Sequence, residues 1–208
     1  RLIMLKRFLR AIAGASLLVS AFSINAETIN FIGVNSNEVD VSSQLSLEVT
    51  QAGNNVDFKI ANAAGGVNVF VGHIYFDFLG TNLFTSLAQT GQLGTVSFTG
   101  DASSSQNFSE GNTIGFTTDA DADRNGGASN GINIGEFLIL SAVLSDSTDI
   151  LGLLNSGGLR VGLHMQGFAS GGSDSYVTGP SAVPVPAAAW LLMSGLGLFG
   201  VARRRLNK

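Results

Sequence analysis

The sequence contains no cysteine, so no disulfide can support the fold. The core must therefore hold the protein together without cross-links, and the stretch 27–179 is long enough to form one domain with such a core. Proline is also scarce, and the three prolines of the chain all lie between 180 and 186. They oppose both helix and strand there, which predicts an extended, accessible tether.

Basic side chains are scarce in the central part of the chain. Of the 11 Lys and Arg residues, four precede Glu27 and four follow Ala202, which leaves Lys59, Arg124 and Arg160 against all 15 Asp and Glu. A body this acidic repels phosphate backbones, so nucleic acid is excluded as a partner. The same charge favours solubility and the binding of cations.

Residues 1–26 have the pattern of a signal peptide. Lys6, Arg7 and Arg10 form a positive region, the stretch 11–22 is apolar and uncharged, and Ala26 is a small residue at the expected cleavage point before Glu27. The pattern predicts export through the Sec translocon and cleavage by signal peptidase. A permanent N-terminal anchor is the alternative, which the shortness of the apolar run disfavours.

The stretch 180–208 forms a tail in three parts: a Val-Pro-Val-Pro motif at 183–186, an uncharged apolar run at 187–202, and a basic cluster at 203–208. As a helix the apolar run is about 24 Å long, at about 1.5 Å per residue, close to the ~30 Å of a bilayer core. Three consecutive arginines favour a transmembrane helix over a buried core helix, and they place the body outside the cytoplasm.

This tail resembles the PEP-CTERM sorting signal of Gram-negative bacteria. The resemblance rests on Val183, Pro184, Val185 and Pro186, the following apolar run, and Arg203, Arg204 and Arg205; Val185 departs from the family, which most often has Glu there. It implies that an exosortase in the inner membrane recognises and removes the tail, and that the protein belongs with exported exopolysaccharide or biofilm material. The tail is also labelled an ice-binding protein C-terminal domain, a label that implies no ice binding.

The body is predicted to be all-β, because apolar and polar residues alternate with a period of two and turns are rich in Gly, Asn and Ser. The expected strands cover 28–34, 39–49, 56–60, 67–78, 95–99, 113–118, 136–144, 159–168 and 175–178. One helix is expected at 147–154, ended by Gly157 and Gly158. Short strands without alternating helices favour a β-sandwich, either jelly-roll or immunoglobulin-like.

A dense acidic segment, 119–127, carries carboxylates at alternate positions followed by Asn125 and Gly126. We interpret it as a tight loop. Its oxygens suit Ca²⁺, with Asp119, Asp121, Asp123, Asn125 and Glu136 as candidate ligands. Ile132 stands where an EF-hand needs its closing Glu, so an EF-hand is excluded. A solvated acidic turn is the alternative.

Histidine and aromatic residues are the remaining candidates for chemistry. His73 and His164 lie in apolar strands without a nucleophile motif or a third metal ligand nearby, so no catalytic residue is predicted. Arg160 is expected either to pair with a carboxylate near a sheet end or to face solvent. The aromatic residues around 75–84 could form a sugar-binding platform, but most aromatic residues of a sandwich lie in its core.

These patterns together predict a non-enzymatic protein of the cell surface or extracellular matrix. The expected partners are the exosortase, signal peptidase, the Sec translocon, the inner membrane (transiently, through the tail) and extracellular polysaccharide. A carbohydrate-binding module is the first alternative and a secreted hydrolase the second. Calcium is the one candidate cofactor.

Overall fold

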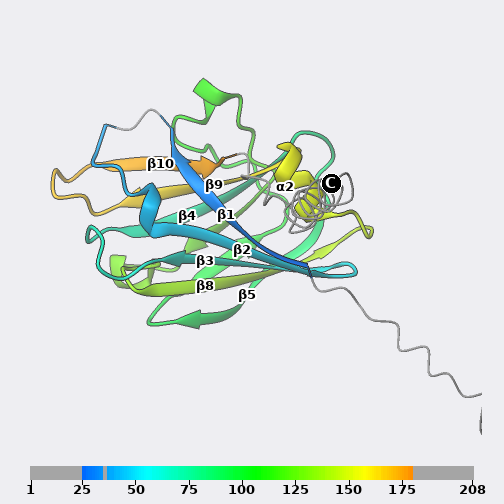
Figure 1. The fold of residues 1–208 in the computed structure, drawn as a ribbon, viewed down its shortest axis with the longest axis horizontal. Coiled ribbons are helices and arrows are strands. Elements are labelled where there is room, and N and C mark those ends of the chain that lie inside the picture. Colours follow the sequence, from blue (N-terminus) through cyan, green and yellow to red (C-terminus); the bar gives the residue numbers. More distant parts are fainter. Residues whose placement is uncertain (1–24, 35–36, 180–208) are drawn as a thin grey trace, which may run out of the picture.

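Strands dominate the part of the chain that the structure describes. The structure is a computed structural model, and it describes residues 25–34 and 37–179 (Figure 1). The strands are β1 Asn25–Gly33, β2 Leu45–Ala52, β3 Asn55–Asn62, β4 Phe70–Phe78, β5 Phe84–Leu93, β6 Phe98–Asp101, β7 Ala120–Arg124, β8 Glu136–Leu144, β9 Leu159–Gln166 and β10 Ser173–Thr178. One α-helix, α2 Ile150–Ser156, and the 3₁₀ turns η1 Ser42–Gln44, η2 Gly111–Ile114 and η3 Ala128–Asn130 complete this part of the chain. The predicted all-β class is confirmed.

All these strands belong to one antiparallel sheet, in the order β5-β8-β3-β2-β1-β10-β9-β4-β7-β6. Strand β1 connects its two halves, because residues 25–30 pair with β2 and residues 31–33 pair with β10. We refer to β5, β8, β3, β2 and the start of β1 as the β2 half, and to the remaining strands as the β4 half. The strands thus form one continuous sheet, with β1 shared between the halves.

The two ends of the sheet approach each other, so that the sheet is nearly closed. The side-chain amide of Gln89 in β5 donates to the carbonyl of Val96 (3.1 Å), just before β6, and accepts from the backbone N–H of Phe98 (2.7 Å). Gly100 of β6 lies so close to β5 that a Cβ there would be 2.5 Å from the Leu87 carbonyl oxygen. A side-chain amide therefore replaces part of the backbone pairing between the two edge strands, β5 and β6.

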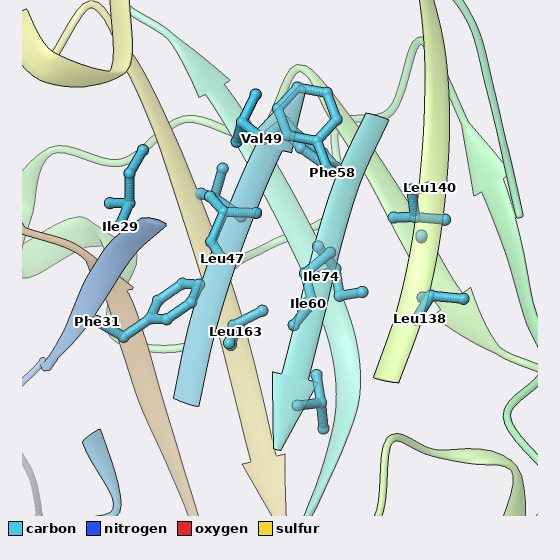
Figure 2. Close-up of a cluster of buried hydrophobic side chains, with 14 of the residues drawn as sticks. Ile29, Phe31, Leu47, Val49, Phe58, Ile60, Ile74, Leu138, Leu140 and Leu163 are labelled. Atoms are coloured by element: carbon cyan, nitrogen blue, oxygen red, sulfur yellow. The ribbon is translucent and has the colours of Figure 1, made fainter. Parts of the chain in front are cut away.

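The core lies between the two halves. Alternate residues of β2 and β3, such as Leu47 and Ile60, are fully buried, as the period of two predicts. Figure 2 shows Ile74 of β4 and Leu163 of β9 meeting these side chains from the opposite half, and all four belong to one hydrophobic cluster. Burial of this apolar surface is the main favourable contribution to folding in a protein without disulfides.

Several predicted elements are confirmed closely. The β2–β3 hairpin turns at Gly53, whose φ of 61° lies in the left-handed region that favours glycine. The stretch predicted at 136–144 is β8, and the stretch at 159–168 contains β9. The helix begins three residues later than predicted, at Ile150, and ends as predicted at Gly157, which has a φ of 77°.

Other predictions about the elements are wrong. The expected strand at 113–118 is a turn and a loop, because η2 ends at Ile114 and an irregular stretch follows it. Strand β5 was missed, since most of its side chains are polar and only Phe84 and Leu87 are buried. The acidic segment that we interpreted as a loop contains strand β7.

No helix within 25–34 and 37–179 is long and apolar enough to cross a membrane. The predicted transmembrane helix at 187–202 lies outside the described residues.

Candidate functional site

The predicted sorting residues, 183–186 and 203–205, lie outside the described residues, as do positions 1–24 of the predicted signal peptide. Ala26 lies in β1, where it pairs with Thr50 of β2. The described chain ends just after β10, where the N–H of Gly179 donates to the carbonyl of Asn30 (3.1 Å). The last strand of the body therefore ends directly before the predicted tether.

Strand β7 places the predicted calcium ligands differently from a tight loop. Ala120 and Ala122 face the core and are fully buried, whereas Asp121 and Asp123 lie on the outer face of the β4 half. The alternation of small and acidic residues is therefore that of a strand with one apolar and one polar face. A loop that gathers these carboxylates around one ion is not formed.

The five candidate ligands have separate partners. Asp119 accepts from the N–H of Phe78 (2.8 Å), Asp123 from the amide of Gln106 (2.8 Å), Asn125 from the hydroxyl of Thr99 (2.9 Å) and Glu136 from the N–H of Asn133 (2.9 Å). Asp121 is hydrogen-bonded to the side chain of Ser104, and its Oδ2 is buried without a hydrogen-bond partner. Among the described residues no group of three or more His, Asp or Glu could hold a metal ion. Calcium binding stays a prediction that this geometry does not support.

A polar row crosses the outer face of the β4 half. Sheet register places Asp123, His73, His164 and Ser175 side by side on β7, β4, β9 and β10. Nδ1 of His73 lies 2.5 Å from a carboxylate oxygen of Asp123, but the two atoms are not aligned for a hydrogen bond. The two imidazole rings meet edge to face, with centroids 6.1 Å apart. Sequence reasoning missed this row, because register is set by strand order and not by local pattern.

Burial shapes the electrostatics of this face. The side chain of Asp121 is 3% exposed, and burial together with the nearby charge of Asp123 raises its pKa to about 6. Burial and the neighbouring His73 lower the pKa of His164. Burial and the nearby charges of Asp123 and Asp121 raise the pKa of Tyr75 to about 12. These shifts all follow from polar groups that lie close together, away from water.

A loop, residues 102–118, covers part of this face, and we call it the covering loop. Its rings of Phe108 and Phe116 pack over Tyr75 in a small cluster separate from the main core. Gly162 makes room for them, since a Cβ there would be 3.0 Å from Phe108 and 3.2 Å from Phe116. Ser175, on the same face of the sheet, is 1% exposed, so its hydroxyl is not accessible to a substrate in this structure.

Arg160 fastens the covering loop to the sheet. Its guanidinium pairs with Asp77, which is 1% exposed, and donates to the carbonyls of Ile114 (2.9 Å) and Gly115 (2.6 Å). It also lies over the ring of Phe116, 5.2 Å from the centroid. The expectation that Arg160 pairs with a carboxylate is confirmed.

The aromatic group considered as a sugar platform is buried. Tyr75, Phe76, Phe78 and Phe84 are each at most 7% exposed, and the last three pack edge to face. The interpretation of these rings as packing residues is confirmed, and they offer no surface to a sugar.

The surface is hollowed at the end of the sheet near α2. A pocket of about 300 Å³ lies between the end of β4, the segment that follows it, and the helix. The side chains that line it are those of Phe78, Leu79, Thr81, Leu83, Thr148 and Leu153. No charged side chain contributes, so the pocket suits an apolar group.

Comparison with known proteins identifies the tail. Residues 182–205 match the PEP-CTERM protein-sorting motif. No curated protein sequence is similar to this chain. A solved structure described as "pH-induced modulation of Streptococcus parasanguinis adhesion by Fap1 fimbriae" is similar with a TM-score of 0.36 and 11% identity, over 81% of this chain and 96% of that chain. A similarity this weak carries no argument about function.

The fold and the matched motif together define the class: an all-β body followed by a C-terminal sorting signal. The signal is the PEP-CTERM motif, which implies an exported protein whose tail is anchored in the membrane until an exosortase processes it. The resemblance of residues 183–186 and 203–205 to that signal is thus confirmed.

Proposed function

We propose that this protein, once exported and freed of its tail, is a non-enzymatic component of the cell surface or extracellular matrix, associated with exopolysaccharide. The observation that carries the proposal is the sorting motif at 182–205, which directly follows the folded body. The proposal is supported by the acidity of that body, where three basic side chains stand against 15 carboxylates. Such a charge keeps a released protein soluble in a polymer matrix.

Burial of Ser175, the one hydroxyl of the polar row, supports a role without catalysis. Ser175 is 1% exposed, and the hydroxyl of a nucleophile must reach its substrate. The body then acts as a scaffold that presents its charged outer surface. We place its activity in adhesion or matrix structure for this reason.

Processing is tested by following the protein in cells with and without the exosortase. Replacement of Arg203, Arg204 and Arg205 by Ser should leave full-length protein in the inner membrane, because the basic cluster fixes the orientation of the tail. Cells without the exosortase should retain it there as well. Release of protein of the same reduced mass from exosortase-free cells would contradict the proposal.

The matrix role needs a second measurement. Mature protein should co-sediment with exopolysaccharide isolated from the same cells, and salt should alter this binding if the acidic surface takes part. The same polysaccharide stripped of protein serves as the added ligand, and a neutral dextran of similar size as the control. Equal sedimentation with both polymers would place the protein elsewhere than in the matrix.

A further inference from the structure

The pocket near α2 lies at the end of the sheet where the described chain stops. Leu79, on its rim, donates its N–H to the carbonyl of Gly158 (2.9 Å), and Val161 donates to the hydroxyl of Thr178 (3.1 Å) at the end of β10. The strand order is β10-β9-β4, so a single strand separates the chain exit from the pocket. In Figure 1 the β10 arrow points toward the end of the sheet that carries α2.

The tether is long enough to reach the pocket. Neighbouring strands are about 4.8 Å apart, which places Gly179 roughly 10 Å from the rim across β9. Val183 is the fourth residue after Gly179, and an extended proline-rich chain advances about 3.1 Å per residue, or about 12 Å over this distance. The first residues of the sorting motif can therefore reach the pocket without a change in the body.

The chemistry of the two parts also matches. Residues 183–186 read Val-Pro-Val-Pro and carry no charge, like the side chains that line the pocket. Leu79 lines the pocket and is 66% exposed, so its side chain is free to contact a docked segment. Proline fixes the backbone before binding, so an extended Pro-rich segment loses little entropy when it docks on an apolar groove.

We propose that the pocket binds the segment 183–186 of the chain's own sorting motif before the exosortase acts. This inference rests on the proposed processing by the exosortase, and docking of the motif would regulate that processing. An exosortase needs the motif exposed, so the docked form is protected and only the undocked fraction is processed. Docking also turns the α2 end of the body toward the membrane, since the predicted transmembrane run begins at Ala187.

The absence of cysteine permits a direct test in the full chain. Thr81→Cys with Val183→Cys places one thiol in the pocket and one in the motif, and a disulfide forms only when their Cα atoms come within about 7 Å. The protein is isolated with its tail, from exosortase-free cells, after mild oxidation. Thiol labelling and intact mass then count the free thiols.

The matched control is Ile32→Cys with Val183→Cys, because Ile32 is also exposed and lies beside the chain exit, where a Cβ on Gly179 would be 3.2 Å from its side chain, so an undocked tether reaches it as well. We expect the pocket pair to be mostly oxidised and the control pair to stay reduced. Equal oxidation of the two pairs, or none in the pocket pair, would overturn the proposal. This readout needs no processing, so it stands apart from any failure of the proposed function.

The regulatory effect is measured by pulse-chase in cells that contain the exosortase. Leu79→Ser should weaken docking and speed processing about twofold or more, while Leu93→Ser, an equally conservative change of an exposed leucine, leaves the rate unchanged. An unchanged rate in Leu79→Ser would refute the competition. If no variant is processed at all, the proposed function fails while the disulfide test still decides on docking.

Discussion

The ion pair between Arg160 and Asp77 is the interaction whose loss we expect to cost most. Nε of Arg160 donates to a carboxylate oxygen of Asp77 at 2.8 Å, and the carboxylate is 1% exposed. Arg160→Met keeps much of the apolar stem but leaves the carboxylate buried without a counter-charge. It also removes the hydrogen bonds from Arg160 to the carbonyls of Ile114 and Gly115, which hold the covering loop against the sheet.

The expected loss of stability is about 3–5 kcal/mol, the usual cost of removing one partner from a buried ion pair. The two released carbonyls add little, because they lie at exposed residues where water replaces the guanidinium. Loss of the cation–π contact with Phe116 adds about 0.5–1 kcal/mol. For a domain of this size the sum lowers Tm by about 10–20 °C.

Urea unfolding of the mature protein, followed by far-ultraviolet circular dichroism, measures this loss. The decisive control is the double variant Arg160→Met with Asp77→Leu, which removes both charges. Replacement of a whole buried pair by apolar side chains is often nearly neutral, so the double variant should recover most of the stability. A single variant that costs less than about 1 kcal/mol, or a double variant as unstable as the single, would refute the reasoning.

Three further predictions concern the outer face and the sheet closure. The fold raises the pKa of Asp121 from 3.8 to about 6, so the stability that this shift contributes is present below pH ~4 and is lost as the pH rises through about 6. Asp121→Asn should therefore be more stable than wild type at pH 7.5 by about 2–3 kcal/mol. Melting curves should show this difference vanish near pH ~4. Gly162→Ala should cost about 1–3 kcal/mol, because its Cβ would press on Phe108 and Phe116, and faster proteolysis within the covering loop should accompany the loss; an unchanged cleavage rate would speak against the close fit. Gln89→Ala should cost about 1–3 kcal/mol through two lost hydrogen bonds between β5 and β6, and amide exchange at Phe98 should accelerate, whereas uniform exchange would mean that the amide does not close the sheet.

The elements that the sequence predicted well are those whose signal is local. Alternation at Leu45, Leu47 and Val49 indicates a strand because side chains of a strand point to opposite faces in turn. Gly53 and Gly157 mark a turn and a helix end, since both need a backbone conformation that glycine adopts freely. These features depend on a few neighbouring residues and need no knowledge of the rest of the fold.

Strands with weak hydrophobic signals were beyond this reasoning. In β7 the core-facing residues are only Ala120 and Ala122, and the other face is acidic, so the segment resembles a polar loop. In β5 most residues are polar, and the strand is held by pairing with β8. Such strands form because neighbours supply hydrogen bonds and burial, which a single segment does not reveal.

The sequence by itself determined the all-β class, the acidity of the body and the sorting signal at 182–205, because composition, alternation and linear motifs are properties of neighbouring residues. Tertiary structure alone decided which side chains meet. His73 lies beside Asp123 rather than Asp77, and Asp77 beside Arg160, because strand order and register join residues far apart in the chain. The same nonlocal pairing dispersed the five predicted calcium ligands among separate partners and placed an apolar pocket near the chain exit.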